Sequence, residues 1–229
     1  MAKKVFIGVG HGGKDPGATA NGFKEKDLNL SIALACNSEL LRHGVSVQMS
    51  RTKDENDALN EEIKECNAFN PDLCIDIHNN AGGGDGAEVF YHYKGGTSKT
   101  LAENALSEIV AIGQNSRGAK IRTNARGVDY YGFIRETYAP AVIVECAFLD
   151  NIEDIKAIDT EEEQRRMGLA IARGILKTLG IATKQEENTT PTDSVLYRVQ
   201  VGAYAKKANA ERMAEKLTSL GFDAIIVKK

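Results

Sequence analysis

The stretch Val5-Phe6-Ile7-Gly8-Val9-Gly10-His11 is a short apolar run that ends at a polar residue. Leu73-Cys74-Ile75-Asp76-Ile77-His78 and Ala141-Val142-Ile143-Val144-Glu145 follow the same pattern. Short, nearly continuous apolar runs are typical of strands in a sheet that is covered on both faces. Helical patterns separate these runs, so residues 4–181 predict an α/β domain. We expect an open, mixed, mostly parallel sheet with helices on both faces.

The spacing of apolar residues gives the positions of the expected elements. Strands are expected at residues 5–10, 45–50, 73–77, 88–93, 130–135 and 141–144. Helices are expected at 28–42, 55–69, 99–114 and 161–179. The last helix has the clearest boundaries, because Thr160 and Glu163 form a capping-box pattern at its start and Gly180 follows its end.

The composition changes twice after residue 181. Residues 182–194 are polar with nothing to bury, which is typical of a linker. In residues 195–229, an alternating run, a helical spacing from Ala210 to Leu220 and an apolar run at 224–227 predict one βαβ unit. We therefore interpret the chain as a main domain at 1–181, a linker at 182–194 and a small module at 195–229.

Composition and charge exclude several classes of partner. The 229 residues are 42% hydrophobic and 27% charged, which allows one substantial core and a small second one. The net charge is -3, with Lys and Arg spread along the chain, so we expect no nucleic-acid partner.

The sequence contains no run of about 20 apolar residues, the length that a membrane-spanning helix needs. The apolar run at 5–9 is too short for a signal peptide, so we expect export by another route or release on lysis.

Polar residues that follow apolar strands indicate a candidate site, since ligands of open α/β sheets bind beyond the carboxyl ends of the strands. Three of the expected strands are followed directly by His11, His78 and Glu145, which places these residues at this edge. Glu25 lies in the loop that enters the first helix. Two neutral imidazoles and one carboxylate, with a fourth position for water, are a common ligand set of catalytic zinc. A second carboxylate could act as general base. Spacing alone does not decide which glutamate binds the metal.

The alternative interpretation is that His11 and His78 cap their strands independently. For a lone histidine this would be favoured, but two histidines at strand ends with two glutamates to match favour a shared site. Asp76 precedes His78 by two residues, so it points to the same face and could support it. We expect Asp15 in a turn beside Pro16, and Glu88 to face solvent.

Four motifs resemble the signatures of the zinc-dependent N-acetylmuramoyl-L-alanine amidases. They are His11-Gly12-Gly13-Lys14-Asp15-Pro16-Gly17-Ala18, Glu25-Lys26-Asp27-Leu28-Asn29-Leu30, Asp76-Ile77-His78-Asn79-Asn80-Ala81 and Pro140-Ala141-Val142-Ile143-Val144-Glu145. Their order and spacing match over residues 4–180. The third motif departs from the usual Ser-Ile-His-Ala-Asn, which keeps the histidine and changes its surroundings.

The resemblance implies an enzyme that hydrolyses the amide between N-acetylmuramic acid and L-alanine in peptidoglycan. Such an enzyme acts on the cell wall, either outside the cell or after lysis. His11, Glu25 and His78 would hold Zn²⁺, and Glu145 would be the catalytic glutamate. Asn79 and Arg122 are the candidate substrate contacts. Arg122 belongs to the cation-rich segment 117–127, for which a solvated loop is the alternative to a groove wall that meets peptide carboxylates.

The tail resembles the sporulation-related repeat, a peptidoglycan-binding module. The resemblance rests on Leu196-Tyr197-Arg198-Val199-Gln200-Val201-Gly202-Ala203-Tyr204, Asn209-Ala210-Glu211 and Leu220-Gly221-Phe222, about half of the usual two-repeat domain. It implies a tether that raises the local substrate concentration. Because chains below about 40 residues rarely fold alone, two tails are expected to pair, which gives a homodimer through residues 195–229.

Two other functions remain open from the sequence. A wall-binding protein could keep the fold without activity, although the presence of all four metal and base residues argues against it. A zinc hydrolase could act on another amide, as a peptidase or deacetylase does. The groups exposed by the reaction separate these functions, because an amidase frees an alanine amine and leaves the lactyl ether carboxylate intact.

Overall fold

The chain divides into two units, residues 1–184 and 185–229. The structure, a computed structural model, describes residues 2–56, 58–183, 202–204, 206–219 and 226. In the second unit it describes one helix, α6 (Lys207–Ser219), which confirms the helical spacing seen in the sequence. The strands expected at 195–201 and 224–227 lie outside the described residues, apart from Ile226. The domain boundaries stay a prediction.

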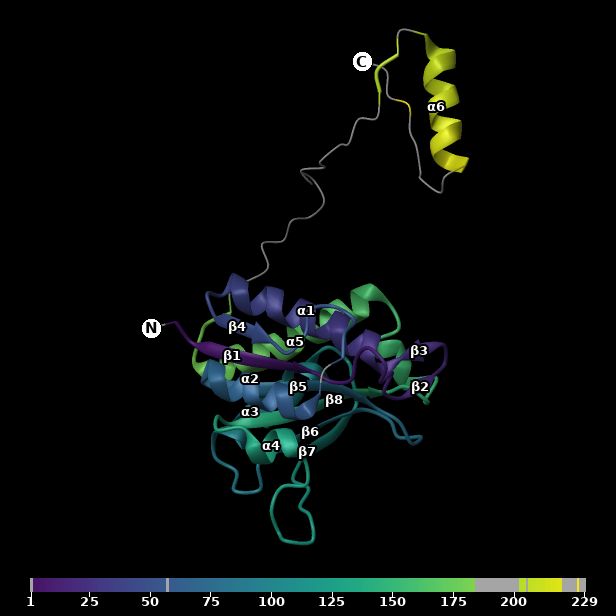
Figure 1. Cartoon of the computed structure of the whole chain (residues 1–229). Helices are drawn as coiled ribbons and strands as arrows, with labels where there is room; N and C mark the ends of the chain where they lie inside the picture. The colour runs from purple at the N-terminus through teal and green to yellow at the C-terminus, as the bar shows by residue number, and fades with distance from the viewer. Residues whose placement is uncertain (1, 57, 184–201, 205, 220–225, 227–229) are drawn as a thin grey trace. The chain divides into compact units, whose positions relative to one another are not determined.

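The first unit is built on a six-stranded sheet with the order β4-β1-β5-β8-β6-β7 (Figure 1). Neighbouring strands are parallel except for β6 and β8, which are antiparallel, so the expected mixed and mostly parallel sheet is confirmed. Two-residue strands β2 (Thr19–Ala20) and β3 (Phe23–Lys24) form a separate hairpin. The six strands are β1 (Lys4–Val9), β4 (Ser46–Met49), β5 (Leu73–Asn80), β6 (Ala87–Tyr91), β7 (Ser116–Lys120) and β8 (Ala141–Phe148).

Helices cover both faces of the sheet, but unequally. On one face the core includes residues of α1 (Glu25–Arg42), α3 (Thr97–Ala111) and α5 (Glu161–Leu179), with the short 3-10 helix η1 (Asp154–Ala157) nearby. Among the described residues, the helices on the other face are α2 (Leu59–Phe69) and the five-residue α4 (Gly132–Glu136), over a smaller core. The second face therefore has room for polar side chains at its edge.

Helix α5 shows how local sequence fixes an element. Thr160 accepts a hydrogen bond from the backbone of Glu163 at 3.2 Å, and Gly180 ends the helix in the left-handed conformation. Both features were expected from the sequence, and the helix has the predicted bounds. Gly168 packs against the backbone of α1, where a Cβ atom would lie 2.4 Å from the carbonyl oxygen of Ile32.

Two sequence-based expectations on the second half of the sheet were wrong. Residues 130–135 were expected as a strand, but Gly132–Glu136 form helix α4, from which Phe133 and Ile134 both enter the core. Strand β7 was not predicted, and its residues were assigned to a cation-rich segment. It is an edge strand that pairs only with β6 and has little apolar character, so it lacks the pattern on which strand prediction relies.

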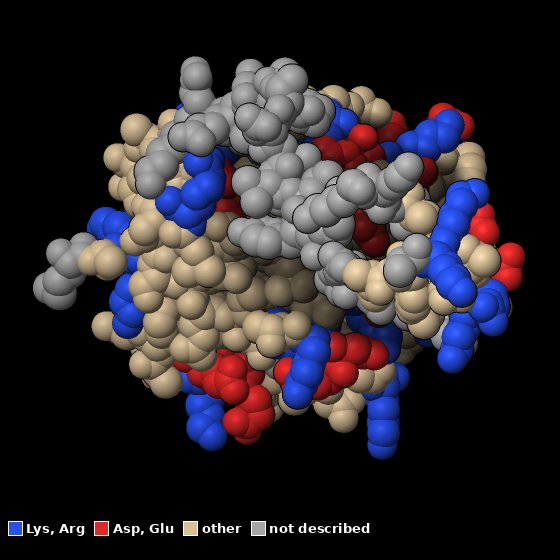
Figure 2. Space-filling model, turned by 90° about the horizontal axis from the view of Figure 1, so that it is seen from above, with Lys and Arg blue, Asp and Glu red and all other residues tan. Residues whose placement is uncertain are grey.

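Among the described residues, no helix combines the length and the apolar character that a membrane span requires. On the face drawn in Figure 2, basic and acidic side chains alternate around a broad area of other residues. Charge of both signs is thus mixed on this face.

Gly168→Ala tests the packing of α5 on α1. Alanine normally stabilises a helix by about 0.5–1 kcal/mol relative to glycine, but here the added methyl group meets backbone. We expect a net loss of about 1–3 kcal/mol in the free energy of unfolding, measured by urea denaturation. Gly132→Ala is the control, because its nearest neighbour is the flexible end of Leu59 at 3.0 Å. Equal stability of the two variants would contradict this packing.

Candidate metal centre

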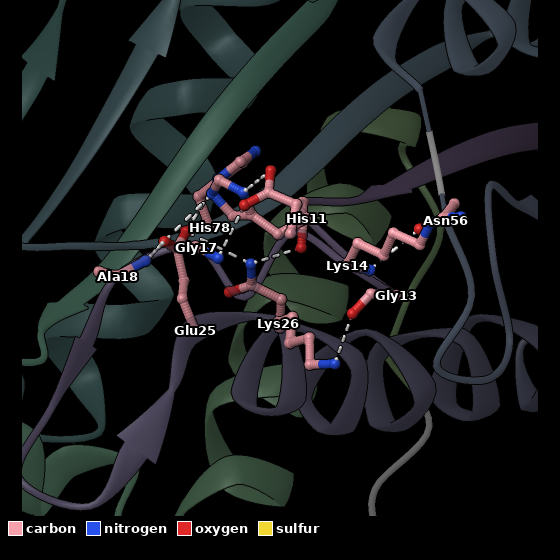
Figure 3. Close-up of polar contacts among 12 residues, drawn as sticks. His11, Gly13, Lys14, Gly17, Ala18, Glu25, Lys26, Asn56 and His78 are labelled. Atoms are coloured by element: carbon pink, nitrogen blue, oxygen red, sulfur yellow. Dashed lines mark hydrogen bonds and ion pairs between the residues drawn. The ribbon is translucent and has the colours of Figure 1, made fainter.

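Three side chains from separate parts of the chain converge at the carboxyl edge of the sheet. His11 follows β1, Glu25 is the first residue of α1, and His78 lies on β5. Glu25 lies between the two imidazoles, with Oε2 at 3.1 Å from Nε2 of His11 and Oε1 at 3.0 Å from Nδ1 of His78. One candidate ligand atom from each residue lies within 4.8 Å of the others (Figure 3). The set expected from the sequence is therefore brought together.

The loop that carries His11 is held in an unusual conformation. His11 has a φ of 64°, a left-handed value that is uncommon outside glycine. The backbones of Gly12 and Asp15 exchange two hydrogen bonds across the turn. Lys26 donates to the carbonyl of Gly13 at 2.9 Å, and the buried guanidinium of Arg51 donates to the carbonyls of Val9 and Gly10. Sequence reasoning missed Arg51, which has no motif around it.

Glu25 is buried, with 4% of its surface exposed, yet its carboxylate is well satisfied. Oε2 accepts a hydrogen bond from the backbone of Ala18 at 2.9 Å, and Oε1 accepts one from the backbone of Asn79 at 3.2 Å. The side chain of Asn29 lies one turn further along α1 and donates to Oε1 at 3.4 Å. Glu25 belongs to the helix rather than to the preceding loop, so the positive end of the helix dipole also favours its charge.

A polar row crosses the thinly covered face of the sheet at one level. His78 on β5 is in register with Glu145 on β8, and Glu145 is in register with Glu88 on β6. Strands β5 and β8 are longer than expected and run through these polar residues. Directly after β1, a Cβ atom at Gly10 would lie 2.2 Å from the ring of His78, so glycine leaves space for the imidazole.

Glu145 has the environment of a proton acceptor. The residue is half-buried, and its Oε2 is buried with no hydrogen-bond partner within the described part of the chain. Burial raises the pKa of Glu145 to about 7, against an opposing effect of the nearby His78. A carboxyl group with a pKa near neutrality can both take and return a proton at neutral pH.

Glu88 does not face solvent, contrary to the sequence-based expectation; it is buried. Its carboxylate pairs with Arg117 at 3.0 Å and with Lys120, both from β7, and accepts a hydrogen bond from Asn80 at 3.0 Å. Burial tends to raise the pKa of Glu88, but these two cations lower it overall. The sequence could not show this arrangement, because β7 itself was not predicted.

The two candidate substrate contacts differ in their surroundings. Asn79 is buried, and its side chain donates to Asn29 at 2.8 Å on the opposite side of β5 from His78. Its contribution to the centre is the backbone N–H that binds Glu25. Arg122 is exposed, with its guanidinium 4.0 Å from the ring centre of Tyr130 and a hydrogen bond to the hydroxyl of Tyr131 at 3.2 Å.

The donors of the centre fit a zinc ion. Two imidazole nitrogens and one carboxylate are ligands that Zn²⁺ prefers. The carboxylate of Glu25 is buried between imidazoles rather than beside a lysine or arginine in the ion pairs of the described residues. The carboxylate oxygens and the imidazole nitrogens therefore point their lone pairs toward one place, where a cation would bind.

Comparison with known proteins assigns the first unit to a family. The family model for N-acetylmuramoyl-L-alanine amidase matches residues 5–177. The chain belongs to this family. A sporulation-specific N-acetylmuramoyl-L-alanine amidase of Bacillus subtilis (strain 168) is 35% identical over 231 residues, which cover 99% of this chain and 85% of the relative. The expected family and enzyme class are confirmed.

Solved structures agree with the amidase assignment. Cwp6 from Clostridium difficile matches with a TM-score of 0.77 and 40% identity, over 78% of this chain and 30% of that chain. The amidase AmiC2 of Nostoc punctiforme matches with a TM-score of 0.70 and 31% identity, over 78% and 97% of the two chains. A second family model, the SPOR domain, matches residues 172–229 and confirms the resemblance of the tail.

The charges of the metal-free amidase centre depend on one another. Hydrogen bonding to Glu25 raises the pKa of His11 above 6.5. Burial opposes the charge of His78, but Asp76 and Glu25 raise its pKa well above 6.5. Burial likewise opposes the charge of Glu25, while both histidines lower its pKa. Because metal ligands must be deprotonated, protons and a metal ion compete for the same atoms of this centre.

The metal-free amidase should lose stability as the pH rises above 6.5, the ordinary pKa of histidine. A raised pKa in the folded state stabilises it fully below the unfolded value, and this stabilisation disappears as the pH rises through the folded value. We expect the melting temperature, measured with a chelator present, to decline as the pH rises from 6.5 through the raised pKa values of His11 and His78.

Glu25→Gln should flatten that decline, because it removes the carboxylate between the imidazoles. His92→Gln is the control, since His92 lies beside Asp129 instead of in the centre and should keep the decline. A wild-type melting temperature that rises or stays constant above pH 6.5 would be inconsistent with these charges.

Proposed function

We propose that the chain binds one zinc ion through His11, Glu25 and His78 and uses Glu145 to hydrolyse the amide between N-acetylmuramic acid and L-alanine in peptidoglycan. The observation that carries this proposal is the position of Glu25 between two imidazoles, with Glu145 in register with His78 on the next strand. Family membership supports the substrate and the reaction.

Zinc, when bound, would supply a Lewis acid that makes water more acidic and polarises the scissile carbonyl. Glu145 accepts the proton of the attacking water, which its unpartnered Oε2 and its raised pKa favour. The protonated Glu145 returns this proton to the nitrogen of the departing alanine. His11 and His78 stay neutral and hold their positions during the reaction. The products are a glycan strand and a free stem peptide.

Arg122 is the proposed contact to the substrate. Its guanidinium is exposed and packs on Tyr130 and Tyr131, which orient it without neutralising its charge. A stem peptide carries carboxylates, for which an oriented guanidinium is a suitable partner. For Asn79, burial against Asn29 favours a supporting role, in which the residue holds Glu25 through its backbone.

Digestion of purified sacculi tests this function. Mass spectrometry of the products should show a free alanine amine and an intact lactyl ether carboxylate. New amines elsewhere in the peptide, or deacetylated sugars, would instead indicate a peptidase or a deacetylase. Absence of any product from zinc-loaded protein would indicate a wall-binding protein without activity.

Two variants separate the metal ligand from the base. Glu145→Gln keeps the shape of the side chain and should keep zinc, while turnover falls by about 10²- to 10⁴-fold because the water lacks its proton acceptor. His78→Ala should lose both zinc, by elemental analysis, and activity. The assignment fails if Glu145→Gln turns over like the wild type, or if His78→Ala retains zinc.

The tail is proposed to bind peptidoglycan and to pair with a second tail, which would make the amidase a dimer through residues 195–229. The match to the SPOR domain supports the first part. The second part rests on size, because one short helix and the two strands expected from the sequence would bury little apolar surface. Binding of two connected tails would also hold the enzyme on the glycan.

Sedimentation velocity tests the pairing of tails. The full chain should sediment as a dimer at micromolar concentration, whereas a chain that ends at Gly180 should sediment as a monomer. A full chain that stays monomeric while its tail gives dispersed, ordered resonances would rule out pairing.

A further inference from the structure

The two ring nitrogens of His78 have different partners. Nδ1 lies 3.0 Å from Glu25 and thus faces the other candidate ligands. Nε2 lies on the other side of the ring, 3.2 Å from Oδ2 of Asp76. His11 has a similar arrangement, with Nε2 directed at Glu25 and Nδ1 at 2.8 Å from Asp15. Each imidazole is therefore placed between the centre and an aspartate.

The two aspartates are not equivalent. The side chain of Asp15 is 67% exposed, whereas that of Asp76 is 4% exposed. Solvent weakens the interaction of Asp15 with its imidazole, and the buried pair of Asp76 and His78 is weakened much less. Asp76 therefore has the stronger influence on the orientation of a ligand.

The surroundings of Asp76 are unfavourable for a carboxylate that serves stability alone. Its Oδ1 is buried without a hydrogen-bond partner among the described residues, and its recorded ion pair is with His78. A second buried carboxylate, that of Glu62 on α2, also lies beside Gly8. Oxygens of Asp76 and Glu62 lie 2.7 Å and 2.1 Å from the point where Gly8 would carry a Cβ atom. Because a buried polar atom without a hydrogen-bond partner is costly, the position of Asp76 calls for another explanation.

We propose that Asp76 is a positioning residue of the metal centre, which accepts the Nε2–H of His78 and thereby keeps Nδ1 unprotonated and directed at the metal. This inference rests on the proposed zinc site. The side chains fit the role, since Asp76 and His78 lie on one face of β5, and Gly8 on β1 and Gly10 just after it leave space for both. Neutral imidazole has one N–H, so a fixed acceptor at Nε2 selects the tautomer that leaves Nδ1 free.

Zinc affinity of the full chain tests the proposal, measured by competition with a chelator of known affinity. Asp76→Ala removes the acceptor and should weaken zinc binding by about 10- to 100-fold. Asp76→Asn keeps an acceptor oxygen of the same shape without the charge, so its loss should be smaller. Asp72→Asn is the control. Asp72 directly precedes β5, is exposed and pairs with Lys3, so its replacement should leave zinc affinity unchanged.

A second measurement reports the tautomer directly. In zinc-loaded protein with ¹⁵N-labelled histidine, the resonances of His78 should show a proton on Nε2 and none on Nδ1. In Asp76→Ala the proton should no longer be confined to Nε2, so that the two tautomers of His78 are mixed or exchange. A change in stability alone would not alter the position of this proton. If Asp76→Ala does not fold, Asp76→Asn decides by the same two measurements.

The possible results of these measurements distinguish the proposed zinc site from the proposed role of Asp76. Wild-type protein that binds no zinc would reject the metal site itself. Wild-type protein that binds zinc, together with both Asp76 variants at unchanged affinity and an unchanged His78 pattern, would reject only the role of Asp76. Weaker binding with the tautomer pattern lost supports the proposal.

Discussion

The carboxylate of Glu25 lies almost completely buried between two imidazoles, and a charge in such a place is costly unless it is paired and hydrogen-bonded. Much of the surrounding structure meets this requirement. The loop after β1 supplies the backbone of Ala18, β5 supplies the backbone of Asn79, and α1 supplies its positive end. The first unit thus brings together three distant segments around one negative charge.

The unequal covering of the sheet explains where the centre lies. One face is filled by three long helices and is apolar, whereas the other carries α2 and the short α4. Polar residues can occupy the second face only where small neighbours leave space, which Gly8 and Gly10 provide beside Asp76 and His78. Gly8 in the apolar strand β1 and Gly10 directly after it therefore leave the space that these polar side chains occupy.

The sequence predicted the parts of the fold that have a strong local pattern. Helix α5 and strand β1 were found because capping residues and apolar runs mark them, and the candidate ligands were found because they follow such runs. Strand β7 and helix α4 were missed, since an edge strand with charged residues and a single helical turn carry no clear period. Glu88 was misplaced for the same reason, because the cations that pair with it come from β7. Likewise Arg51 stabilises the His11 loop through contacts between residues distant in sequence, which no spacing reveals.

The proposed zinc ion lies between His11, Glu25 and His78, beside Glu145. Diffraction from crystals of the zinc-loaded full chain, recorded on both sides of the zinc absorption edge, tests this position directly. We expect a strong anomalous peak within bonding distance of Nε2 of His11, the carboxylate of Glu25 and Nδ1 of His78. A zinc peak that lies elsewhere, with these three side chains still in contact with one another, would contradict it.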